Sequence, residues 1–150
     1  SVLTIKVAGE KNGERCPLDA ETETQLAAYI AEIKDAGVRI ELVNIDADTF
    51  NCDVDIYYDP MLLPEQVENA CRAAIKEYIE NLPFNGEYTN MALVDRLQMV
   101  EGVKIPELRS ASTSANGEAT AVTAVPIDAR YIPQAGYFMV GSLTINMFPY

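Results

Sequence analysis

The chain has 150 residues and a formal net charge of −12, with 23 acidic residues against 11 basic ones. It contains no histidine, which excludes Ser/His and Cys/His nucleophilic mechanisms and any histidine-ligated zinc site. The acidity disfavours nucleic acid and anionic membranes as partners, because both require clustered lysine and arginine. With 49% hydrophobic residues, this length suffices for one full core and favours a single domain.

The three cysteines, Cys16, Cys52 and Cys71, are odd in number and form no CxxC pair, which favours reduced structural thiols in a reducing compartment. No apolar run approaches the roughly 20 residues that a membrane helix needs. The chain starts at Ser1 and enters a strand pattern at once, so we expect it to be a fragment of a longer protein.

Three strands are predicted in the first 60 residues. In each of them apolar residues occupy every second position, as expected when one face of a sheet is buried. A turn-rich loop, with Asn12 and Gly13 near its centre, follows the first strand. The predicted strands are residues 2–7, 38–42 and 50–58.

Three helices are predicted from apolar residues at helical spacing. Thr22 is expected to cap the first helix and Gly37 to stop it. The second has the strongest period and starts at a proline, and the third is expected to be capped by Thr89 or Asn90 and stopped by Gly102. The predicted helices are residues 22–37, 64–82 and 89–102.

The last third of the chain differs from the rest, since 19 of the 23 acidic residues lie within residues 1–99. A fourth strand is expected from Val103, at a sheet edge because Pro106 interrupts it. A polar turn and two further strands then form an appended β-hairpin on the same domain. The core is expected over residues 1–109 and the appendage over residues 110–150, with a turn at 110–117 and strands at 118–127 and 137–148.

The order of elements predicts an α+β fold, a ferredoxin-like split βαβ two-layer sandwich with an antiparallel sheet and the C-terminal β-hairpin added. In that fold the third strand lies between the first and the second. Asp53 and Asp55 on its outer face are then expected to lie beside Lys6 and Arg39.

No catalytic residue, cofactor site or metal site is predicted. The aspartates between residues 46 and 59 do not match a calcium loop, because Phe50 stands at the third ligand position and Asn51 where glycine is needed. We expect them to face solvent. No phosphate-binding glycine loop follows the first strand, and no base accompanies the hydroxyls of Ser110, Ser112, Thr113 and Ser114.

Five of the twelve aromatic residues lie in the last twenty positions, in a segment with little charge. Tyrosine and phenylalanine are enriched in protein–protein interfaces, where charge is depleted. These residues form the candidate interface, with ordinary core packing as the alternative: Tyr131, Tyr137, Phe138, Phe148 and Tyr150.

The chain also resembles a known family. Its elements together resemble the C-terminal region of baseplate J-like proteins. The elements that carry the resemblance are the first strand, the helix 22–37 with Val38 after it, the strand 52–58, the helix 64–82, the helix that ends in residues 100–103 and the closing segment 131–137. Those proteins are wedge components of contractile phage tails. The resemblance implies a non-catalytic structural role, with other baseplate subunits or a second copy as partners and neither nucleic acid nor membrane. It implies a location in the bacterial cytoplasm during assembly and in the virion tail baseplate afterwards.

Two alternatives remain open. A ferredoxin-like regulatory module would hold a small ligand between the loop after the first strand and the helix start at Thr22. A metal-dependent enzyme would have to use Asp46, Asp48 and Asp53.

Overall fold

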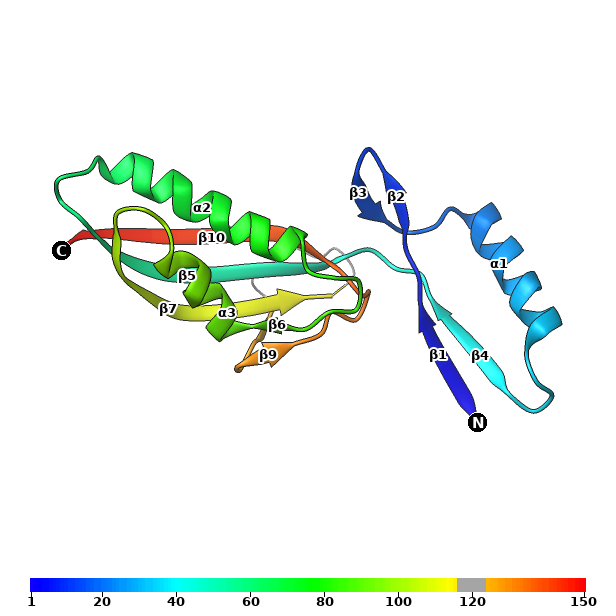
Figure 1. Ribbon diagram of the computed structural model, residues 1–150. Coiled ribbons are helices and arrows are strands. Elements are labelled where there is room, and N and C mark those ends of the chain that lie inside the picture. Colours follow the sequence, from blue (N-terminus) through cyan, green and yellow to red (C-terminus); the bar gives the residue numbers. More distant parts are fainter. Residues whose placement is uncertain (116–123) are drawn as a thin grey trace.

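The computed structural model describes residues 1–115 and 124–150, which form a mixed α+β arrangement with three helices and several sheets (Figure 1). We divide these residues into an N-terminal lobe, residues 1–46, and a main lobe, residues 47–115 and 124–150. The two lobes lie side by side and are joined where the chain enters the long strand β5 (Figure 1).

The N-terminal lobe is a parallel pair of strands joined by a helical crossover, with a small hairpin inserted after the first strand. Strands β1 and β4 pair in parallel from Val2 opposite Arg39 to Lys6 opposite Val43. Strands β2 and β3 form the antiparallel hairpin, and its turn is Asn12-Gly13, both with positive φ, which suits the right-handed twist of a two-residue hairpin. The elements are β1 (Val2–Lys6), β2 (Gly9–Lys11), β3 (Glu14–Cys16), α1 (Ala20–Ile33) and β4 (Arg39–Val43).

The main lobe contains a four-stranded mixed sheet in the order β10-β5-β7-β8, with β10 parallel to β5 and the other two pairs antiparallel. Helix α2 packs against β10, and α3 against β7 (Figure 1). The core lies between the helices and the sheet. The elements are β5 (Asp48–Tyr58), α2 (Pro64–Glu80), β6 (Tyr88–Thr89), α3 (Asn90–Gln98), β7 (Val103–Ser114), β8 (Val125–Pro126), β9 (Arg130–Tyr131) and β10 (Phe138–Pro149).

The three predicted helices all form, with a corrected start for the first. Thr89 caps α3 as expected, its hydroxyl accepting from the Ala92 N–H at 3.1 Å. The cap of α1 is Asp19 rather than Thr22, because the Asp19 carboxylate accepts from the Thr22 N–H at 2.7 Å. Helix α1 also ends before Gly37, whose positive φ forms the turn into β4.

The predicted strand order is wrong. Among the described residues no strand separates β1 from β4, and β5 belongs to the mixed sheet, so the ferredoxin-like antiparallel arrangement is not observed. Asp53 and Asp55 consequently lie away from their expected partners. Lys6 donates to Asn85 and the Pro133 carbonyl instead, at 2.7 and 2.9 Å.

The C-terminal hairpin is also not paired as predicted. Strand β10 pairs with β5, whereas most of the predicted strand 118–127 lies outside the described residues and its end, β8, pairs with β7. Strand β7 continues through Arg109 to Ser114, where a polar turn leading into the appended hairpin was expected. Strand β8 pairs with Ser112 and Thr113, and no other described strand pairs with that side of β7 at Pro106, whose ring nitrogen has no hydrogen to donate.

Candidate protein-interaction site

Three of the five predicted interface aromatics pack as core residues. Tyr137 and Phe138 are only 5% and 7% exposed. Tyr131 is half-buried, with its ring 5.8 Å from that of Phe138. Burial raises the pKa of both Tyr131 and Tyr137 to about 12, so neither phenol ionises near neutral pH.

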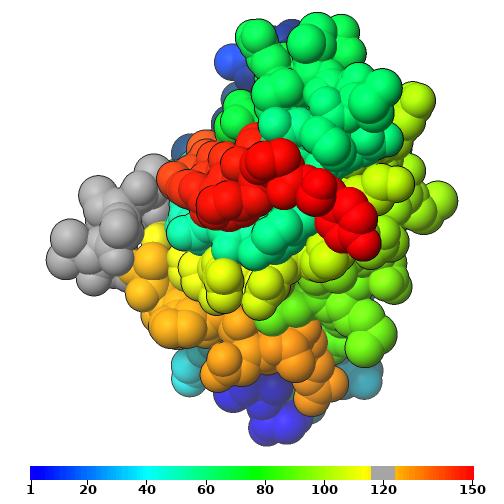
Figure 2. All heavy atoms as spheres, turned by 90° about the vertical axis from the view of Figure 1, so that its left-hand side faces the viewer, coloured from blue at the N-terminus to red at the C-terminus, as the bar shows by residue number. Residues whose placement is uncertain are grey.

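The other two aromatics lie on the surface at the end of the chain. Phe148 is 42% exposed and stacks on Tyr57 of the neighbouring strand, with ring centroids 5.5 Å apart, and Tyr150 is 68% exposed. Figure 2 shows the end of β10, in red, uncovered on this face of the molecule. Of the predicted interface residues, Phe148 and Tyr150 are therefore the ones accessible to a partner.

Asp48, expected to face solvent, is completely buried, so that prediction is wrong. Its carboxylate accepts from the Tyr131 hydroxyl at 2.9 Å and from the Gln134 and Ala135 N–H groups at 2.9 and 3.0 Å. Three donors offset the cost of removing a carboxylate from water. These bonds fix the segment before β10 to the start of β5.

Asp55 is likewise buried rather than solvent-facing. It accepts from Arg109 Nε at 2.6 Å and from Asn146 Nδ2 at 2.9 Å, and the same amide donates to Asp53 at 2.8 Å. The hydrogen bond from Arg109, followed by that from Asn146, holds the pKa of the Asp55 carboxyl below its usual range. Because Arg109 lies on β7 and Asn146 on β10, these contacts join three adjacent strands.

In the described part of the chain, the residue types considered above for catalysis or metal binding do not form a cluster. Across residues 1–115 and 124–150, no group of three or more His, Cys, Asp or Glu residues is placed to hold a metal. All three cysteines are free, and burial raises the pKa of Cys52 to about 12 and of Cys71 to about 11. The four hydroxyls between Ser110 and Ser114 lie in β7. No helix in the described part of the chain is long and apolar enough to cross a membrane.

The N-terminal lobe lacks a buried core of its own. None of the residues 1–46 is buried, and α1 contributes no buried side chain. Parallel sheets normally have both faces covered, and two strands alone are at best marginally stable. The large apolar side chains left more than half exposed are Val2, Leu3, Tyr29 and Ile33. The alternation of apolar and polar residues predicted that one face of these strands is buried. How completely other elements cover that face depends on tertiary packing, which the alternation does not show.

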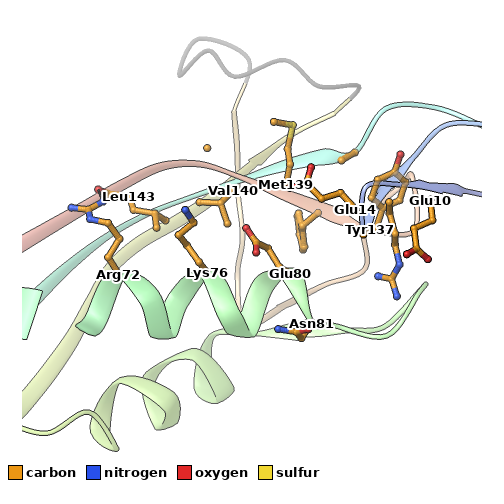
Figure 3. A pocket seen from close by; sticks show the side chains of 15 residues that line it. Glu10, Glu14, Arg72, Lys76, Glu80, Asn81, Tyr137, Met139, Val140 and Leu143 are labelled. Atoms are coloured by element: carbon orange, nitrogen blue, oxygen red, sulfur yellow. Dashed lines mark hydrogen bonds between the residues drawn. The ribbon is translucent and has the colours of Figure 1, made fainter. Parts of the chain in front are cut away.

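A groove of about 710 Å³ lies where the β2–β3 hairpin approaches α2 and β10 (Figure 3). The hairpin is fixed there by Arg15, which donates to the Leu82 carbonyl at 2.9 Å and lies 5.6 Å from the centre of the Phe84 ring. Sequence reasoning missed this groove, because its walls come from three separate parts of the chain.

No protein-family model matches the chain, and no curated protein matches it.

Proposed function

We propose that this chain is a structural component of a contractile phage or prophage tail baseplate, acting by contact with neighbouring subunits and without catalysis. The resemblance to the C-terminal region of baseplate J-like proteins gives the proposal its biological setting. The single observation that supports an assembly role is the N-terminal lobe, in which no residue is buried.

Covering the exposed side chains of this lobe would stabilise a complex with a neighbouring subunit. Full burial of one large apolar side chain stabilises by about 1.5–3 kcal/mol. Val2, Leu3, Tyr29 and Ile33 are 52–61% exposed, so covering all four would contribute roughly 3–7 kcal/mol. A neighbouring subunit that packs on this lobe would therefore gain affinity and stabilise the lobe at the same time.

The exposed aromatic end of β10 is a second contact in this proposal. Phe148 and Tyr150 expose large apolar side chains in a segment, residues 131–150, that contains no charged residue, and this composition suits the centre of a protein–protein interface. An assembly protein with two separate contact regions can bridge two neighbours.

The test is genetic complementation in the bacterium or prophage that encodes the chain. Deleting the reading frame should give particles without assembled baseplates in electron micrographs. Complementation with Ile33→Asp should fail or be impaired, whereas Gln25→Asp, an equally added charge at an exposed polar site on the same helix, should restore baseplates. Complete, contracting tails from the deletion strain would refute the proposed function.

A second candidate function, the small-ligand-binding regulatory module, is favoured by one observation. A hollow of about 620 Å³ lies beside the loop after β1 and the start of α1, with Lys6, Gly9, Thr22 and Leu26 among its lining residues. A thermal-shift screen with amino acids and nucleotides distinguishes the two functions. A specific upward shift for one compound would support the module, and no shift with any of them would count against it.

A further inference from the structure

The groove beside α2 has the architecture of a strand-binding site. One wall is β10, the edge strand of the main sheet, whose outer side pairs with no other described strand. The opposite wall is α2, and Arg72 reaches from it to donate to the Leu143 carbonyl at 3.1 Å. Met139, 45% exposed, and Val140 supply apolar contacts. Edge strands offer unpaired N–H and C=O groups, to which an extended peptide can add as a further strand. Because Arg72 occupies the Leu143 carbonyl, the added strand would pair with the part of β10 before Leu143.

The charges along this groove change sign from one end to the other. Arg72 and Lys76 line the end near Leu143. The end at the β2–β3 hairpin is lined by Glu80, Glu14 and Glu10 and by one cation, Arg15, so acidic side chains outnumber basic ones there (Figure 3). Within the described residues Lys76 and the three glutamates form no ion pair. These groups are therefore available to an occupant that carries both signs of charge.

The C-terminal end of α2 adds an independent reason to expect a cation there. The last turn of this helix contains no basic residue and instead carries Glu77 and Glu80. Helix C-termini bear a partial negative charge and are stabilised by lysine or arginine. Arg15 donates to the Leu82 carbonyl just beyond this end, and a basic side chain from a bound segment would add a second positive charge, beside Glu80.

The spacing of the charges sets the length of the occupant. Arg72 and Glu80 are eight positions apart on one helix, which at 1.5 Å per residue corresponds to about 12 Å. An extended chain covers that span in about four residues, and residues four apart lie on the same side of a strand. Both charged side chains of one extended peptide can therefore face α2.

We propose that the groove between α2 and the free edge of β10 binds an extended polypeptide segment with an acidic and a basic side chain four residues apart. The acidic side chain lies against Lys76 and Arg72, and the basic side chain enters the Glu80 end. The main chain of the segment pairs with β10, and its apolar side chains contact Met139 and Val140. This proposal does not rest on the baseplate function, which depends on the N-terminal lobe.

The test uses a random nonapeptide library panned against the immobilised full chain, followed by affinity measurements on the selected peptides. Selected sequences should carry an acidic and a basic residue four positions apart. Their affinity should fall about five- to tenfold for Lys76→Glu and for Glu80→Lys. The matched control is Asp95→Lys, an exposed charge reversal on α3 outside the groove, which should bind as the wild type does.

A second measurement locates the bound peptide. Hydrogen exchange of the β10 amides between Phe138 and Leu143 should slow when a selected peptide is present. Thermal melting should show that all three variants remain folded, because the substituted side chains are exposed. Failure to select any peptide, or selected peptides that bind both groove variants as tightly as the wild type, would overturn the proposal.

Discussion

Replacement of the buried Asp48 by alanine should destabilise the protein severely. The substitution removes an acceptor of three hydrogen bonds and leaves the Gln134 and Ala135 N–H groups and the Tyr131 hydroxyl without their partner. Hydrogen bonds to charged groups contribute about 1.5–3 kcal/mol each, partly offset by the cost of burying the carboxylate. We expect a loss of about 3–5 kcal/mol, a large part of the 5–15 kcal/mol typical of a domain.

Two further substitutions separate the contributions of individual hydrogen bonds to this loss of stability. Asp48→Asn retains the shape, but its single carbonyl oxygen cannot replace both carboxylate oxygens, so one N–H group faces a donor and about 2 kcal/mol is lost. Tyr131→Phe removes only one donor and should cost about 1 kcal/mol. Asp46→Ala is the matched control, because Asp46 is exposed and its loss should change stability by less than about 0.5 kcal/mol.

The assay is urea-induced unfolding followed by far-ultraviolet circular dichroism, since the chain has no tryptophan. The midpoint should fall in the order Asp46→Ala, Tyr131→Phe, Asp48→Asn, Asp48→Ala, with a similar denaturant slope in each. A loss below about 1 kcal/mol for Asp48→Ala would refute the reasoning, because the three donors would then find equally good partners without the carboxylate.

Two other predictions concern titratable groups. Cys52 and Cys71 are buried and have raised pKa values, so they should resist alkylation in the native protein, whereas the half-exposed Cys16 should react. Mass spectrometry of the labelled peptides measures this difference, and labelling of either buried thiol in the native state would contradict the structure. The pKa of Asp55 is lowered by Arg109 and Asn146, so its contribution to stability is present above the unfolded value of about 4 and is lost as pH falls through the lower folded value. The difference in urea midpoint between wild type and Asp55→Asn should therefore shrink on acidification, and equal midpoints at neutral pH would show that this contact contributes nothing.

Much of the local structure could be predicted from the sequence. The apolar period after Pro64 and the Thr89 cap predicted α2 and α3, and alternation predicted the strands that became β5 and β10. These features depend on residues within a few positions of one another, and spacing along the chain determines which side of a helix or strand is apolar. The mixed α+β class followed from the same signals.

Strand pairing and burial of the polar groups were decided by tertiary structure. Alternation shows that one face of β10 is apolar, but several partners would cover such a face, and only the folded chain selects β5. Asp48 resembles a solvent-facing aspartate in sequence because its donors, at Tyr131, Gln134 and Ala135, lie more than 80 residues away.

The charge of the chain and the exposure of its side chains differ in the same way. The amino-acid sequence alone shows that the chain is acidic, lacks histidine and has most of its negative charge in residues 1–99. The folded structure determines which apolar side chains stay exposed in both lobes, and it places Lys76 and Glu80 of α2 in one groove with the β2–β3 hairpin. The physical reason is that charge is a property of each residue, whereas exposure and the field within a groove depend on neighbours that only folding brings together.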